Sequence, residues 1–130
     1  MTGRARPQLL DEPPLVLYPS LAGAYGLLGA LLVQQLHYWL TRPGGVDDQT
    51  QTHWVWKTGE DFAEELGGAV DVSTVRRELQ RLVRKGVVIA TWRSLIDQRV
   101  DPRDRTKAYR LDYARFPGTA APRKSKMQSV

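Results

Sequence analysis

The sequence predicts an α+β domain in which helices pack against a small three-stranded antiparallel sheet. Two observations support this class. Apolar residues recur at helical spacing in several segments between positions 20 and 85. Three short runs are instead rich in β-branched and aromatic residues, as strands are: 53–57, 87–93 and 107–113.

One domain with a single core is expected from a chain of 130 residues that is 42% apolar. Residues 1–14 contain three prolines and few apolar groups, so they are expected to form a flexible N-terminal arm. From Ala114 onward Pro, Gly, Ser and basic residues dominate, which predicts a basic disordered tail over 114–130. The folded domain is therefore placed at 15–113.

The N-terminal half of the domain predicts two successive helices followed by a strand and a third helix. Ser20 is expected to cap a short first helix that Gly26 closes, and Leu27–Leu40 forms the next. After a Gly-rich loop, residues 53–57 form a strand. Thr58 then caps a helix, with Asp61 three residues later as a weak variant of the capping box.

The helix expected after residue 70 is amphipathic and basic. Asp71 or Ser73 can cap it, and Gly86 supplies the left-handed residue that ends it. At about 100° per residue its side chains separate into two faces. The apolar face contains Val72, Val75, Leu79, Leu82 and Val83. The polar face contains Ser73, Thr74, Arg77, Gln80, Arg81 and Arg84.

Charge is distributed unevenly along the chain. Residues 1–70 contain four basic and eight acidic residues, a net charge of −4, whereas residues 71–130 contain 15 basic and six acidic residues, a net charge of +9. The C-terminal half is therefore the expected site of contact with a polyanion.

The last two expected strands are joined by a 13-residue loop, 94–106, which contains three arginines and three aspartates. The arginines are Arg99, Arg103 and Arg105, and the aspartates are Asp97, Asp101 and Asp104. Two interpretations remain open. The loop contacts DNA as a wing, or its alternating charges pair locally and keep a flexible connection soluble.

The order of elements is that of a winged helix-turn-helix, in which the third core helix enters the major groove and the hairpin loop contacts the DNA backbone. The candidate DNA-binding residues are Ser73, Thr74, Arg76, Arg77, Gln80, Arg81, Arg84, Lys85, Arg99, Arg103, Arg105 and Lys107. The alternative for the helix is that Arg77, Arg81 and Arg84 only solvate its face, in part by pairing with Glu78.

Other classes of function find little support in the sequence. There is no cysteine and there are only two histidines, so neither a disulfide framework nor a Cys/His metal site is expected. No phosphate loop or nucleophile motif occurs, so we expect no enzyme, catalytic residue or cofactor. The most apolar stretch, 27–40, is interrupted by two glutamines and a histidine, so it is too short and too polar to span a bilayer. The N-terminus does not have the apolar region of a signal peptide. A cytoplasmic, nucleoid-associated protein without membrane contact is expected.

The aromatic residues allow alternative interpretations. His37 and its neighbours are expected in the core, with a dimer surface as the alternative. Trp54 and Trp56 are also expected in the core, although they are of the kind that stacks on nucleotide bases.

Short motifs occur in this order: Leu36-His37-Tyr38-Trp39, Trp54-Val55-Trp56, Ser73-Thr74-Val75-Arg76-Arg77, Lys85-Gly86-Val87-Val88, and Asp104-Arg105-Thr106-Lys107-Ala108-Tyr109-Arg110-Leu111-Asp112-Tyr113. With this order and spacing, residues 15–113 resemble the N-terminal winged-helix domain of phage and plasmid replication proteins, the replisome-organiser or DnaD-like group. The resemblance implies a DNA-binding module of a phage, plasmid or integrated element.

The expected function is sequence-specific binding of double-stranded DNA in replication initiation or local transcription control, as a homodimer or a cooperative array on DNA. The alternative is a protein-interaction module that uses the winged fold to dock on a host replication or transcription protein such as polymerase. Binding to duplex should depend steeply on salt, whereas protein docking should be saturable and indifferent to added DNA.

Overall fold

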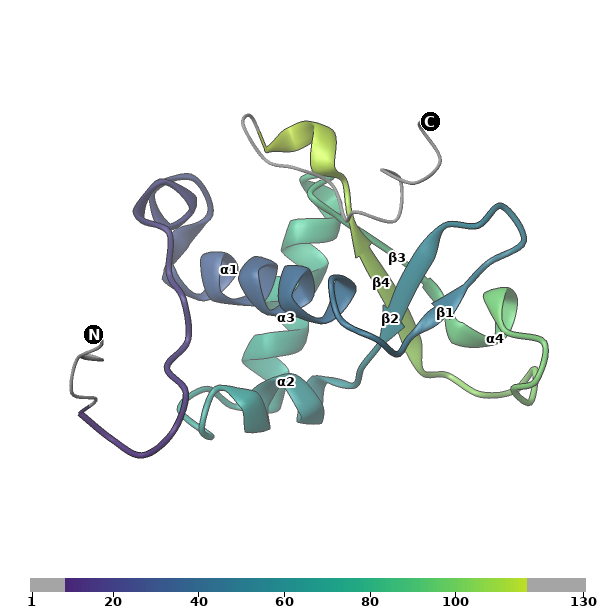
Figure 1. Ribbon diagram of the computed structural model, residues 1–130, viewed down its shortest axis with the longest axis horizontal. Helices are drawn as coiled ribbons and strands as arrows, with labels where there is room; N and C mark the ends of the chain where they lie inside the picture. Colours follow the sequence, from purple (N-terminus) through teal and green to yellow (C-terminus); the bar gives the residue numbers. More distant parts are fainter. Residues whose placement is uncertain (1–8, 117–130) are drawn as a thin grey trace, which may run out of the picture.

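The computed structural model describes residues 9–116 and shows an α+β fold (Figure 1). Its elements in chain order are α1 (Pro19–Leu40), β1 (Val46–Asp47), β2 (His53–Trp56), α2 (Gly59–Glu65), α3 (Val72–Arg84), β3 (Val88–Trp92), α4 (Arg93–Ile96), β4 (Lys107–Leu111) and the 3-10 helix η1 (Tyr113–Arg115). The predicted α+β class is confirmed.

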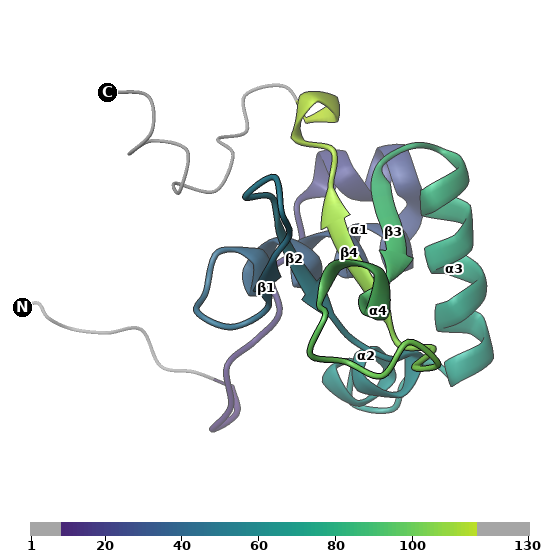
Figure 2. The same ribbon diagram turned by 90° about the vertical axis from the view of Figure 1, so that its right-hand side faces the viewer.

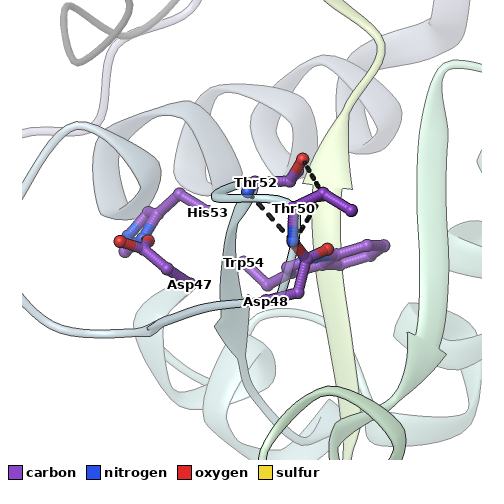
Figure 3. A network of polar contacts seen from close by, with 6 residues as sticks. All are labelled: Asp47, Asp48, Thr50, Thr52, His53 and Trp54. Atoms are coloured by element: carbon purple, nitrogen blue, oxygen red, sulfur yellow. Dashed lines mark hydrogen bonds and ion pairs between the residues drawn. The ribbon is translucent and has the colours of Figure 1, made fainter.

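The sheet has four antiparallel strands in the order β1-β2-β4-β3, so the expectation of three strands was wrong. The additional strand, β1, comes from the Gly-rich loop. The Asp48 carboxylate accepts hydrogen bonds from the main-chain N–H groups of Thr50 and Thr52 and from the indole N–H of Trp54 (Figure 3). These bonds fold the loop into a tight hairpin and pair Val46 with Trp54.

The first helical segment begins and breaks for local reasons. Gly26 has φ 85° and ψ 165°, which interrupts α1 where the sequence predicted the end of a short helix. The predicted N-cap is wrong by two residues. Tyr18 occupies that position and Pro19 follows as the first helical residue, where its fixed φ is favourable.

The connection from β2 through α2 to α3 follows the sequence prediction closely. The Thr58 hydroxyl accepts from the Asp61 N–H at 3.0 Å, and the Asp61 carboxylate accepts from the Thr58 N–H at 2.9 Å, which completes the capping box. Two glycines with positive φ, Gly67 and Gly68, then turn the chain toward α3. Gly86, with φ 81°, follows the end of α3 as expected.

One core connects the helices to the inner face of the sheet, which is the face of Val55, Val88 and Tyr109. It comprises Leu32, Val33, Leu36, Leu40, Val55, Phe62, Ala63, Val75, Leu79, Leu82, Val87, Val88, Tyr109, Leu111 and Phe116. Leu79 and Leu82 are buried as predicted, but Val83 is exposed. Val83 lies at the edge of the apolar face of α3, where it borders a groove instead of the core.

The C-terminal boundaries differ from the sequence prediction. The strands end earlier than expected, at Trp92 and Leu111, because the chain turns into α4 after the first and into η1 after the second. Phe116 is buried in the core, so the domain extends past the boundary expected at Ala114. The rest of the expected tail, 117–130, and residues 1–8 of the expected arm lie outside the described residues. No helix within 9–116 is both long and apolar enough to cross a membrane.

Candidate nucleic-acid interface

A groove of about 780 Å³ separates α3 from the end of the sheet that carries the long loop, which we define as residues 97–106. Figure 2 shows α3 beside β3, with the long loop at the same end of the sheet as α2. One wall is α3, with Arg76, Gln80 and Arg84. The opposite side is formed by Arg105 and by Lys107 at the start of β4. The structure therefore brings together five candidate residues that are separated by up to 31 positions in the sequence.

The groove is basic after its ion pairs are taken into account. Lys57 is paired with Glu65, and Arg76 with Glu60 at 3.1 Å, so these two cations are largely compensated. The Asp104 carboxylate accepts a hydrogen bond from the main-chain N–H of Thr106 at 2.6 Å. This bond holds the pKa of Asp104 below its usual value. Arg84, Arg105 and Lys107 form no ion pair with any carboxylate of residues 9–116.

The outward face of α3 continues this basic surface. Arg77, Arg84 and Lys85 are exposed and have no carboxylate partner within the described part of the chain. Arg77 lies 3.4 Å from the Thr74 hydroxyl. Near the start of the helix the Ser73 hydroxyl donates to Asp71 at 2.7 Å, and bonds from Thr74 and Ser73 lower the pKa of Asp71.

Arg81, like Arg76, is a paired candidate residue of α3. Its guanidinium is paired with Glu78, and it also donates to the main-chain carbonyl of Tyr25 in α1. The hydrogen bonds that Arg81 donates to the Glu78 carboxylate raise the pKa of Arg81. For this residue the pairing alternative matches the structure, and its side chain connects two helices.

The long loop neutralises two of its three arginines. Arg99 is bonded to the buried Asp97 carboxylate at 2.9 Å, and Arg103 to Asp101 at 3.1 Å. These bonds lower the pKa of each aspartate. The Arg105 guanidinium forms no ion pair within 9–116, and its hydrogen bonds go to main-chain carbonyls of the loop, at 3.4 and 3.5 Å. Local pairing is thus observed for Arg99 and Arg103, and contact of the loop with DNA stays a prediction.

Trp92 lines the groove and was missed in the sequence analysis. It is 38% exposed, and Arg105 and Lys107 lie 5.5 and 5.4 Å from its ring centroid. The missed signal was its register: as the last residue of β3, Trp92 pairs with Lys107 and points to the same side of the sheet. Trp54 is buried as expected and Trp56 is half-buried, with the Arg93 guanidinium 3.9 Å from the Trp56 ring centroid.

No family model, curated protein or solved structure matches the chain. The resemblance to phage and plasmid replication proteins therefore rests on short motifs of the sequence. Among residues 9–116, no three His, Asp or Glu side chains cluster as a metal site would require.

Proposed function

We propose that this chain binds double-stranded DNA through a winged-helix arrangement, in which α2 and α3 form the helix-turn-helix and the hairpin of β3 and β4 forms the wing. The observation that supports it most is the convergence of Arg84, Arg105 and Lys107. These cations come from a helix, a loop and a strand, border one groove, and have no carboxylate partner in the described structure. A phosphate backbone would supply the missing negative charge.

In this proposal α3 enters the major groove. Arg77 and Gln80 project from its exposed side and have the donors and acceptors that bind base edges, since Arg binds guanine and Gln binds adenine in bidentate fashion. Arg84, Lys85, Arg105 and Lys107 bind phosphates and set the position of the helix. Two contacts join α3 to its neighbours: Arg81 donates a hydrogen bond to the Tyr25 carbonyl of α1, and Arg76 forms an exposed ion pair with Glu60 of α2.

We further propose that the protein acts at a specific DNA site, in replication initiation or in control of neighbouring genes of a phage, plasmid or integrated element. It would bind as a homodimer or a cooperative array. The motif resemblance supports this role. Selection of bound sequences from a random duplex pool tests it, because a two-fold dimer enriches an inverted repeat.

Titration of a labelled duplex at several salt concentrations tests the interface. The double variant Arg84→Ala/Arg105→Ala should flatten the plot of log affinity against log salt by about two units, one for each lost phosphate contact. Arg42→Ala/Arg103→Ala removes the same charge from residues outside the groove and should leave the slope near that of the wild type. Equal slopes for both double variants would contradict the interface. Absence of duplex binding by the wild type would favour docking on a host protein.

A further inference from the structure

We propose that Trp92 is a stacking platform for an unpaired base of DNA, so that the protein prefers duplexes flanked by single-stranded nucleotides over fully paired ones. This inference rests on the proposed duplex binding and adds a ligand for the inside of the groove. Aromatic side chains bind unpaired bases of any sequence, because every base has a π-face.

The ring of Trp92 is accessible, unlike those of the two tryptophans in β2. Arg93 lies 3.9 Å from the Trp56 ring centroid, which is direct stacking contact, and Trp54 is only 7% exposed. At Trp92 the nearest cations are about 1.5 Å farther from the ring, at 5.4 and 5.5 Å. Arg105 and Lys107 therefore make longer cation–π contacts with this ring, and neither is stacked on it as closely as Arg93 is on Trp56.

The surroundings of Trp92 suit a nucleotide. Its groove has a volume of about 780 Å³, within the range of roughly 300–1,000 Å³ of pockets that enclose small molecules. Leu79, Val83 and Ala90 supply apolar walls for a base. Arg105 and Lys107 lie over the ring on flexible side chains, which can turn to bind the phosphate attached to the stacked base.

The same geometry explains why the base must be unpaired. In a duplex each base is stacked between its neighbours and bonded to its partner, so its π-face is closed and only its groove edge is available. A base beyond the end of the duplex has a free face and a flexible backbone. With α3 on the duplex, such a base at its margin can enter the groove between α3 and the sheet.

Comparing two DNAs separates the affinity that comes from stacking of a base on Trp92 from the affinity that comes from phosphate charge. Both have the same duplex of about 20 base pairs and the same short single-stranded overhang, but in one the overhang is abasic and so retains its phosphates without bases. The wild-type protein should bind the base-containing overhang roughly 5- to 150-fold more tightly than the abasic one. Trp92→Ala should reduce this ratio to near one, and Trp92→Phe should retain part of it because the ring is kept.

Controls distinguish a lost stacking contact from a lost fold and from a failure of duplex binding. Leu95→Ala changes an exposed apolar residue outside the groove and should leave the ratio unchanged. Thermal unfolding shows whether each variant is folded, and Trp92→Leu replaces Trp92→Ala if the latter is not. A ratio near one in the wild type, with firm duplex binding, overturns the inference and leaves the proposed function intact.

Two further outcomes would also contradict the proposal. If the ratio in Trp92→Ala, or in the Trp92→Leu that replaces it, equals that of the wild type, the base binds elsewhere. If a free mononucleotide binds in a Trp92-dependent way while the overhang gives no gain, the groove is a small-molecule site instead of a site for an unpaired DNA base. Binding of neither DNA by a folded wild-type protein would reject the proposed function itself.

Discussion

The guanidinium of Arg81 in α3 is hydrogen-bonded to the main-chain carbonyl of Tyr25 in α1, one residue before the kink at Gly26. The two helices are close at this point. A Cβ atom added at Gly29 would lie 2.8 Å from the Glu78 carboxylate and 3.2 Å from the Arg81 guanidinium. Arg81 thus bonds a carbonyl of α1 beside the kink, and the ion pair of Arg81 and Glu78 occupies the space that a side chain at residue 29 would need.

Replacing Arg81 with alanine should therefore reduce stability before it affects DNA binding. The variant loses charged hydrogen bonds and leaves Glu78, whose side chain is mostly buried, without its partner. Because about a third of the Arg81 side chain is exposed, we expect a modest loss of about 1 kcal/mol in the free energy of unfolding. Urea unfolding measures it. A variant of unchanged stability with weakened duplex binding would place Arg81 in the interface instead.

The core provides a test that is independent of function. Leu79→Ala should reduce the free energy of unfolding by about 2 to 5 kcal/mol, because Leu79 packs in the core that joins α3 to the other helices and the sheet. Val83→Ala is the matched control on the same helix. Val83 is exposed, so Val83→Ala should reduce the free energy of unfolding by well under half as much as Leu79→Ala. Similar losses for both variants would mean that α3 is packed differently.

Stability should fall at mildly acidic pH because of His37. Burial lowers the pKa of His37, whose Nδ1 lies 2.7 Å from the Tyr113 hydroxyl. The folded state then favours the neutral imidazole, while the unfolded state takes up a proton below pH about 6.5. The unfolded state binds more protons there, so stability is lost as the pH falls below that value.

The variant His37→Phe removes this titration and keeps a ring in the same place. Its free energy of unfolding should change less than that of the wild type between pH about 7 and 5, measured by urea unfolding at each pH. His53→Gln changes the other histidine, which is bonded to Asp47 on β1, and should retain the decline. A decline that persists in His37→Phe would assign it to other groups.

The sequence predicts those parts of the fold that depend on local interactions. Three features each follow from residues a few positions apart: the capping box of Thr58 and Asp61, the break at Gly26, and the end of α3 just before Gly86. The strand β1 was missed because it consists of only two residues. Its pairing with β2 depends on the hydrogen bonds that the Asp48 carboxylate accepts from Thr52 and Trp54. The burial of Phe116 depends on contacts with distant helices, which no local pattern indicates.

The candidate site was predictable in composition and less so in arrangement. The basic face of α3 follows from helical periodicity, but which of its arginines are paired depends on Tyr25 and Glu60, in other helices. In the long loop the alternation of signs indicated local pairing, and the structure shows it for Arg99 and Arg103. Trp92 could be placed on the groove only after the register of β3 and β4 was known.

Specific DNA binding should depend on Arg77 and not on Arg103, although each substitution removes one positive charge. Arg77 is exposed on α3 without a carboxylate partner in the described residues, whereas Arg103 is paired with Asp101. Arg77→Ala should weaken binding to the selected duplex by about 1 to 3 kcal/mol, because a bidentate base contact is lost, and should weaken binding to a random duplex much less. Arg103→Ala leaves Asp101 without its partner and should weaken binding to both duplexes slightly and to the same extent.

Both affinities are measured at one salt concentration, with thermal unfolding of each variant as the control for folding. If Arg77→Ala reduces the two affinities equally, Arg77 contacts phosphate and the base-reading face of α3 lies elsewhere, with Gln80 as the next residue to change.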